Sequence, residues 1–305
     1  TFTESLTKAI RSLEIGKTGI RNIDNRFINL PKNQLQEEIK TPRPRRIFAI
    51  LEAIRRNWPI EDIAFLSKVD LWFLREIEKS FNVNPESTPV SILKMLGWTD
   101  EDLDSKEIKD DLENKRAYKL VDTCSAEFLS KTPYLYSTFG TSDDDSASKN
   151  KKVVVIGSGP NRIGQGIEFD YCCVHGVESL KENNYEAIMI NSNPETVSTD
   201  YDTADKLYFE PLSWDEVKAV LAREKPDSVI IQLGGQTPLK LADKISSAGY
   251  KIAGSSLDVI DATEDRDLFQ KLCLSLNIDQ PKSKISFNED ELISAVKEIT
   301  YPVLL

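Results

Sequence analysis

The sequence has 305 residues, of which 39 are Lys or Arg and 50 are Asp or Glu, so its formal net charge is −11. This acidic balance argues against a general nucleic-acid binder, which needs a basic patch. The length predicts about two domains. The 40% apolar content is enough for buried cores, and no apolar run is long enough to span a membrane.

The four cysteines show no CxxC spacing: Cys124, Cys172, Cys173 and Cys273. Adjacent cysteines are poor disulfide partners, so we expect buried free thiols in a reducing compartment. No His/Cys cluster or acid pair has metal-ligand spacing, and we expect no metal site. The polar, amphipathic first 16 residues do not have a signal-peptide pattern. The sequence therefore predicts a soluble intracellular protein.

The first 145 residues have the apolar spacing of short helices. A helix over 3–13 is expected to end at Gly16 and Gly19. Further helices are predicted over 47–57, 60–67, 71–81, 90–96 and 100–112. Short helices with short links predict a compact all-α domain. It has no histidine and its carboxylates are scattered, so packing or association is favoured over catalysis.

A local basic cluster lies in this helical region, formed by Arg43, Arg45, Arg46, Arg55 and Arg56. Such a cluster can meet a phosphate or an acidic partner. A solvated helix face or an interface rim is the favoured interpretation.

A domain boundary is predicted near residue 145. The aromatic-rich segment 118–139 differs from the helices before it, and its last part, 134–139, alternates as an extended segment would. Residues 142–150 are small and charged, which is typical of an exposed linker.

The stretch 151–170 begins an α/β region. Its apolar run 153–156 suits a buried parallel strand, and glycines follow it at once. Further strands are expected over 187–191, 207–209, 228–232 and 251–253, alternating with helices over 169–182, 214–224 and 239–248. This alternation predicts a parallel sheet with right-handed crossovers.

Small and polar residues follow three of these strands, as a ligand cleft at the carboxyl ends of the strands requires. The clusters are 157–159, 191–193 and 233–236. A nicotinamide dinucleotide site is disfavoured, because Arg162 stands at the third glycine position and Asn191, not an acid, ends the second strand. The lone histidine, His175, is interpreted as a helix residue rather than a ligand or base.

Three long motifs resemble the large subunit of carbamoyl-phosphate synthase, in its second half: GSGPNRIGQGIEFDYCCVH (157–175), NSNPETVSTDYDTADKLYFEP (191–211) and GGQTPLKLA (234–242). The resemblance extends over the whole chain. It implies the tail of a first ATP-grasp half at 1–20 and a helical oligomerisation-like domain with a connecting segment at 21–145. A Rossmann-like pre-ATP-grasp domain at 146–270 and the start of an ATP-grasp domain, cut short within 271–305, would follow.

The resemblance also implies a reaction, in which two ATP, bicarbonate and glutamine-derived ammonia give carbamoyl phosphate. The first half forms carbamate and the second half phosphorylates it, with an internal tunnel between them. By resemblance, Arg162, Gly166, Glu168 and Glu195 lie near the carbamate path. A purely structural role for the two glutamates, capping helices or tying down loops, stays open. Glycine-rich loops at strand ends contain Gly157, Gly159, Gly164, Gly234 and Gly235.

The cofactors implied for the parent enzyme are ATP and Mg²⁺, with Mn²⁺ or K⁺ as alternative ions. The implied partners are a glutaminase subunit or domain and further copies of this chain through the helical domain. The expected location is the cytoplasm, or the stroma or matrix of an organelle.

The clamp residues for ATP are not expected in this chain, so by itself it is expected to be inactive. Arginine or pyrimidine synthesis remain alternative uses of the product. A catalytically inactive assembly or binding module and another ATP-grasp ligase are the alternative functions.

Overall fold

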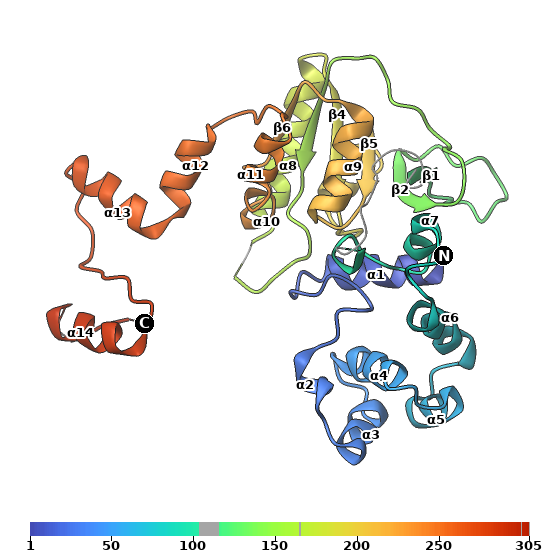
Figure 1. Cartoon of the computed structure of the whole chain (residues 1–305). Coiled ribbons are helices and arrows are strands. Elements are labelled where there is room, and N and C mark those ends of the chain that lie inside the picture. The colour runs from blue at the N-terminus through green and yellow to red at the C-terminus, as the bar shows by residue number, and fades with distance from the viewer. Residues whose placement is uncertain (104–115, 165, 300, 305) are drawn as a thin grey trace. The chain divides into compact units, whose positions relative to one another are not determined.

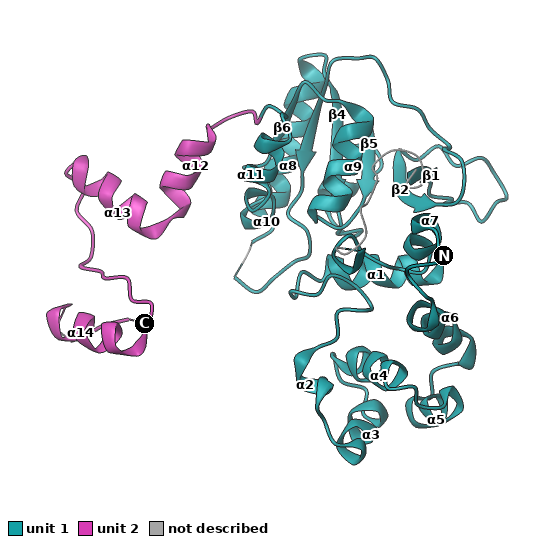
Figure 2. Ribbon diagram, in the orientation of Figure 1, with its two compact units in different colours: residues 1–251 teal, residues 252–305 magenta. Residues whose placement is uncertain are grey.

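The computed structural model describes residues 1–103, 116–164, 166–299 and 301–304. The chain divides into two compact units, residues 1–251 and 252–305, which Figure 2 shows in teal and magenta. The second unit contains the helices α12 (Leu257–Glu264), α13 (Arg266–Ser275) and α14 (Glu289–Ile299). The division expected from sequence, at residues 20, 145 and 270, stays a prediction.

The helices expected in the first 103 residues are confirmed, and two others were missed. Within this described segment lie α1 (Phe2–Ser12), α2 (Asn25–Ile28), α3 (Lys32–Lys40), α4 (Arg46–Arg55), α5 (Ile60–Ser67), α6 (Leu71–Asn82) and α7 (Val90–Met95). The missed elements are α2 and α3. Leu35 and Ile39 of α3 are both fully buried and lie four residues apart, which is the signal that identifies it. The helix expected over 100–112 lies mostly outside the described residues, and 101–103 form a single 3₁₀ turn.

The arginine cluster has acidic partners within the helical region. The carboxylate of Glu52, fully buried on α4, accepts hydrogen bonds from Arg55 at 2.7 Å and from Arg56 at 2.6 Å. Burial would raise the pKa of Glu52, but the hydrogen bonds from the two arginines outweigh it and lower the pKa. Arg43 pairs with Glu38 and Arg45 with Asp24 in the same region.

The sheet lies in the first unit (Figure 1). In the described residues it has six strands in the order β1-β2-β5-β4-β3-β6, and every neighbouring pair except β1–β2 is parallel. The strands are β1 (Arg116–Leu120), β2 (Tyr134–Phe139), β3 (Lys152–Ile156), β4 (Glu186–Asn191), β5 (Lys206–Phe209) and β6 (Ser228–Ile230). The expected α/β class with a mostly parallel sheet is confirmed. The extended segment 134–139 is β2, while β1 was not predicted.

Helices cover both faces of the central strands. On one face, α8 (Glu168–Glu182) packs against β3 and β4, and its buried Cys173 and Val177 share a core with Val155 and Met189. On the other face lies α9 (Trp214–Glu224), whose Glu224 accepts a hydrogen bond from the buried hydroxyl of Tyr208. This coverage explains why β3 is buried along its whole length.

Two expectations after β6 need correction. The helix expected over 239–248 is broken into α10 (Gln236–Leu239) and α11 (Ala242–Ser247). The strand expected over 251–253 is reduced to a single bridge residue, Ile252. The carbonyl oxygen of Lys251 accepts a hydrogen bond from the backbone N–H of Val229 at 2.8 Å, and Gly254 follows with a φ of +99° that turns the chain away.

The segment 142–150 has no regular structure but is not a free linker. Asp143 accepts a hydrogen bond from the backbone N–H of Tyr118 at 2.7 Å and pairs with Arg223 at 2.9 Å. Asp145 pairs with Lys206 at 2.6 Å. These carboxylates therefore tie the segment to the sheet and to α9.

The helix α1 joins the helical region to the sheet. Its apolar side contributes Ile10 to the core of the helical region. Its polar side does not face water: the ammonium of Lys8 lies 2.9 Å from Glu210, and Arg11 lies 2.7 Å from Glu216. Both acidic partners are almost fully buried.

Arg11 contacts two neighbouring carboxylates of α9, because Asp215 lies 3.0 Å from it. Burial would raise the pKa of Glu216, but the charges of Arg11 and Arg116 outweigh burial and lower it to about 2. Burial and the charge of Glu216 raise the pKa of Asp215. The arginines therefore keep Glu216 ionised.

We predict that Glu216→Gln lowers the free energy of unfolding by about 3 kcal/mol, because it leaves the buried arginines less compensated. In the native protein the stabilisation from Glu216 is complete above its ordinary pKa of 4.5 and is lost as the pH falls toward 2. In Glu216→Gln this loss of stability at low pH is absent. The variant also removes the neighbouring charge that raises the pKa of Asp215, and a raised carboxyl pKa makes stability fall as the pH rises. Urea unfolding between pH 2 and 7 measures both effects.

The control is Glu37→Gln, the same chemical change in an exposed pair with Lys40. It is expected to cost less than about 0.5 kcal/mol. Equal stability losses in the two variants, or an unchanged pH dependence in Glu216→Gln, would contradict the assignment.

Candidate functional site

The candidate site lies where the chain leaves the carboxyl ends of β3, β4 and β6. The chain proceeds from β3 through β4 to β5 on one side and then crosses to β6 on the other side of β3. In open parallel sheets, ligands bind in the crevice outside such a switch point. The β3 loop (157–164) and the segment 231–235 follow the two strands that flank it, β3 and β6.

Close backbone packing explains two of the glycines. A Cβ on Gly234 would lie 2.6 Å from the carbonyl oxygens of Gly157 and Ile156. A Cβ on Gly157 would lie 2.6 Å from the amide carbon of Asn191. Both distances are far below van der Waals contact, so only glycine allows the loops after β3, β4 and β6 to meet.

Asn191 ties the β3 loop to a buried polar chain. Its side-chain oxygen accepts a hydrogen bond from the N–H of Gly159 at 3.1 Å, and its side-chain nitrogen donates to the hydroxyl of Ser198 at 3.2 Å. The hydroxyl and backbone N–H of Ser198 both donate to Asp170 of α8. All three side chains at the centre of this chain are almost fully buried. Their satisfied hydrogen bonds hold the β3 and β4 loops in one arrangement.

A carboxylate from outside the α/β region enters the same loop. Glu14, in the turn after α1, pairs with Arg162 and accepts a hydrogen bond from the hydroxyl of Thr237 at 2.8 Å. A Cβ on Gly159 would lie 2.4 Å from its other oxygen. Sequence reasoning missed Glu14, because 148 positions separate it from Arg162 and no local pattern marks it.

The four predicted carbamate-path residues lie in the segments that follow β3 and β4, with Glu168 at the start of α8. Arg162 is partly exposed, whereas Gly166, Glu168 and Glu195 are exposed. The carboxylate of Glu168, at the first position of α8, folds over Gly166, where a Cβ would lie 1.8 Å from it. The backbone N–H of Glu195 donates to the side chain of Asn193 at 3.0 Å. The carboxylate that pairs with Arg162 is that of Glu14.

Two other predicted glycines have left-handed backbone conformations. Gly164 has a φ of +85° and Gly235 a φ of +72°, a region in which residues with a Cβ are strained. Gly235 directly precedes α10. These glycines shape the loops and offer no functional group of their own.

The β3 loop does not fit a nucleotide phosphate. Phosphate-binding loops present backbone N–H groups to an anion. Here a carboxylate already packs against Gly159, and the N–H of that glycine is bound to Asn191. In the part of the chain that the structure describes, no group of three or more His, Cys, Asp or Glu side chains is arranged to hold a metal ion.

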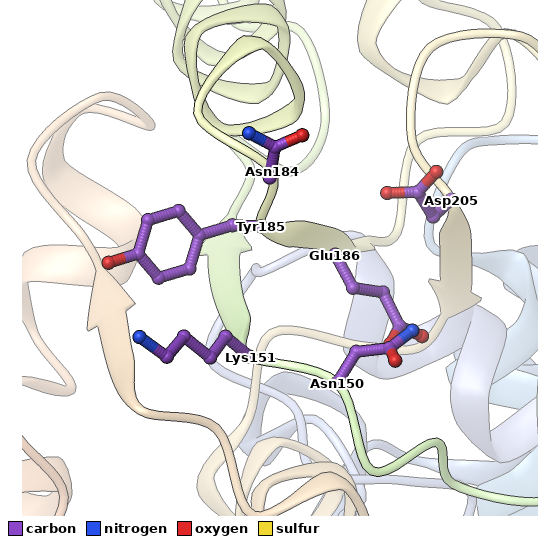
Figure 3. A pocket seen from close by; sticks show the side chains of 6 residues that line it. All are labelled: Asn150, Lys151, Asn184, Tyr185, Glu186 and Asp205. Carbon is purple, nitrogen blue, oxygen red and sulfur yellow. The ribbon is translucent and has the colours of Figure 1, made fainter.

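A hollow of about 550 Å³ lies at the opposite ends of the strands, where β3, β4 and β5 begin (Figure 3). It is lined by Asn150, Lys151, Asn184, Tyr185, Glu186 and Asp205. Its acidic groups are used internally, because Glu186 accepts from Ser148 and Asp205 accepts from the N–H of Ala187. The hollow lies at the amino ends of the strands, whereas parallel sheets bind ligands at the carboxyl ends of their strands.

The cysteines are free, but only two of them are buried. Cys173 and Cys273 are buried, Cys124 is partly exposed and Cys172 is exposed. Cys172 and Cys173 differ because neighbouring positions of α8 face different directions. Burial, with a contribution from Asp170, raises the pKa of Cys173 to about 12, so this thiol stays protonated. His175 lies on the exposed side of α8, 3.0 Å from Glu178, which agrees with its interpretation as a helix residue.

The described residues contain no helix with the length and apolar character that crossing a membrane requires.

Comparisons with known proteins identify the family. Residues 1–103 match a family described as "Carbamoyl-phosphate synthetase large chain, oligomerisation domain". Residues 149–262 match "Carbamoyl phosphate synthase preATP-grasp domain". The whole chain also aligns with carbamoyl phosphate synthase large chains, at 42% identity for Archaeoglobus fulgidus and 45% for Clostridium acetobutylicum. The chain belongs to the carbamoyl phosphate synthase large-chain family.

The chain spans about 30% of the length of these large chains. A third relative, 42% identical over the whole chain and 28% of its own length, is the arginine-specific, chloroplastic large chain of Arabidopsis thaliana. Similarity to solved structures is weak. The biotin carboxylase domain of a thermophilic 2-oxoglutarate carboxylase covers 50% of this chain and 34% of its own, at a TM-score of 0.33 and 18% identity, which is too low to support an argument.

We predict that Gly234→Ala lowers the free energy of unfolding by about 2 kcal/mol or more, since the new methyl group meets rigid backbone. Gly164→Asn is the control, because nothing lies within 4 Å of its Cβ position and asparagine tolerates a positive φ. It is expected to cost less than about 1 kcal/mol. Urea unfolding measures both variants, and equal losses would contradict the packing argument.

Proposed function

We propose that this chain forms the middle part of the large chain of a carbamoyl phosphate synthase, an ATP-dependent C–N ligase. The reaction begins when bicarbonate is phosphorylated by ATP, and ammonia then displaces phosphate to give carbamate. A second ATP phosphorylates carbamate to carbamoyl phosphate, with release of ADP. Glutamine supplies the ammonia.

One observation supports this proposal above all: the large chains align with every part of the sequence at 40–45% identity. No comparison favours the alternative of a catalytically inactive assembly or binding module. The family descriptions support a pre-ATP-grasp domain over residues 149–262 and an oligomerisation domain over residues 1–103; the assignment of the former to the second half of the large chain is part of this proposal. The domain boundaries near residues 145 and 270 described above are part of this proposal.

The role proposed for the site is to wall the carbamate path. Carbamate is an anion that hydrolyses rapidly, so a closed polar route protects it from water. Arg162 offers a permanent positive charge with a forked set of donors. Its side chain is 34% exposed beside the switch point of the sheet. Gly166, Glu168 at the start of α8 and Glu195 after β4 complete the proposed wall.

ATP and its metal ion, Mg²⁺ with Mn²⁺ or K⁺ as alternatives, belong to other parts of the complete enzyme under this proposal. The β3 loop carries a carboxylate where a triphosphate needs hydrogen-bond donors. The proposal therefore gives this loop no part in binding ATP or in phosphoryl transfer. The proposed partners are a glutaminase subunit or domain and further copies of the chain through the helical region. The product would serve arginine or pyrimidine synthesis, in the cytoplasm or an organelle.

The direct test is the length of the native polypeptide that contains this sequence. A length about three times these 305 residues would match the large chains. A native chain that ends near residue 305 would favour the assembly-module alternative instead.

We predict that Arg162→Met, made in a complete large chain containing this sequence, reduces carbamoyl phosphate formed per ATP hydrolysed by roughly tenfold or more. Carbamate would still form in the first half but would reach the second ATP less often. Bicarbonate-dependent ATP hydrolysis should therefore persist. Assays of ADP and carbamoyl phosphate on the same samples give the ratio.

Arg75→Met is the matched control, because Arg75 is an exposed arginine of the helical region that pairs with Glu61 at 3.4 Å. Its ratio of product to ATP should equal that of the native enzyme. A normal ratio in Arg162→Met would refute a role for this loop in the carbamate path.

A further inference from the structure

The arginine cluster of the helical region divides into two sets in the structure. Arg46 and Arg56 donate hydrogen bonds to backbone carbonyl oxygens of the same region, at 2.7 and 2.8 Å, and so hold its fold together. Arg43 and Arg45 are different, because their side chains are 60% and 48% exposed. The proposed function gives these two arginines no role.

The two exposed arginines line an open hollow of about 460 Å³. A third exposed arginine, Arg26 of α2, lines it as well. The other lining residues are Phe27, Leu30, Glu38 and Pro44. Three guanidinium groups therefore surround a hollow whose remaining lining is apolar except for one carboxylate. Sites for small molecules commonly have volumes of roughly 300–1,000 Å³ and combine an apolar lining with a few polar groups.

A single buried carboxylate fixes two of the three guanidinium groups. The Oδ2 atom of Asp24 lies 2.8 Å from Arg45 and 3.0 Å from Arg26. Burial would raise the pKa of Asp24, but the hydrogen bonds from the two arginines outweigh it and lower the pKa to about 2. The carboxylate is therefore ionised at neutral pH, and it holds together two cations that would otherwise repel each other.

The acidic neighbours use only part of the hydrogen-bonding capacity of these arginines. Each guanidinium has five N–H donors. Among the described residues, Asp24 accepts from Nη1 of Arg45, and Glu38 accepts from Nη1 of Arg43 at 2.8 Å. The three arginines also carry one charge more than the two carboxylates paired with them. Most donors of Arg43 and Arg45 thus stay available to an anion from solution.

The backbone around the hollow also favours an anion. Arg45 directly precedes α4, makes no capping hydrogen bond with its side chain, and is followed by no acidic residue in the first turn. The amino end of a helix carries a partial positive charge, so cations are unfavourable there and an anion is favourable. Pro42 and Pro44 restrict the backbone on both sides of Arg43, so little conformational freedom is lost when the loop binds a ligand.

We propose that this hollow binds a small organic phosphate monoester whose body is apolar, preferably aromatic. The phosphate accepts forked hydrogen bonds from Arg43 and Arg45, and its three oxygens give each of the three arginines an acceptor. The apolar body covers Phe27 and Leu30. Inorganic phosphate would leave this lining bare, and an uncharged aromatic molecule would leave the guanidinium groups without an anion. The site is separate from the carbamate path and does not depend on it.

The test adds phenyl phosphate to a complete large chain containing this sequence and follows amide hydrogen exchange along the chain. This readout separates binding at the hollow from binding at the ATP sites of the enzyme. We expect slower exchange in residues 24–30 and 43–48, with a midpoint concentration roughly tenfold or more below that of inorganic phosphate, because the phenyl group is removed from water. Phenol, which has no phosphate, is expected to protect neither segment.

Arginine variants show whether the guanidinium groups hold the phosphate. Arg43→Met and Arg45→Met should each raise the midpoint for phenyl phosphate roughly tenfold or more, because each removes charge-assisted hydrogen bonds. Both variants should still fold, since Glu38 is partly exposed and Asp24 keeps its other arginine. Arg75→Met, in an exposed pair of the same region, is the matched control and should leave the midpoint unchanged.

Three outcomes would overturn the proposal. Unchanged midpoints in Arg43→Met and Arg45→Met would mean that these arginines do not hold the anion. Equal midpoints for phenyl phosphate and inorganic phosphate would mean that the apolar lining takes no part, and that the hollow attracts an adventitious ion only. Slow exchange of both segments before any addition, unchanged by every probe, would mean that another part of the protein covers the hollow.

Discussion

The ion pairs on the polar side of α1 are the constraint on which the rest of the first unit depends. Lys8 and Arg11 point into the α/β region and neutralise carboxylates that are almost fully buried there. Removing either partner leaves a buried charge less compensated, which is more costly than losing an exposed pair. Because α1 is fixed in this way, the turn after it can deliver Glu14 to the glycine-rich loop. A helix that belongs by sequence to the oligomerisation region thus completes the site of the neighbouring α/β region.

Much of the fold could be predicted because its signals are local. The β-branched run of β3 and the apolar spacing of α4 and α6 lie within single windows of sequence. The partner of Arg162 could not be predicted, since Glu14 stands in a turn 148 positions away and looks like any exposed acid. The polar side of α1 was equally ambiguous, because charged residues at helical spacing look the same whether water or a buried carboxylate faces them. Among the site residues, spacing alone marked the glycines, while the tunnel role of Arg162 came only from family resemblance.

The glycines after β3 serve a different purpose from those of a nucleotide-binding loop. In such loops the absence of side chains lets a phosphate approach the backbone. Here it lets Asn191 approach Gly157 and lets Glu14 approach Gly159. The anion at the loop is therefore a permanent part of the protein. The absence of side chains that admits a diffusible ligand elsewhere lets two distant segments of this chain meet here.

The sequence distance that the α1 contacts span has a consequence for synthesis on the ribosome. Arg11 and Glu216 are 205 positions apart. At a translation rate of roughly 5–20 residues per second, α9 emerges roughly 10–40 s after α1. During that time the cationic side of α1 has no acidic partner from α9, although the helices that follow it can already form their own apolar contacts. The turn carrying Glu14 would then be among the last parts of the first unit to reach its final place, after the sheet it joins has been built.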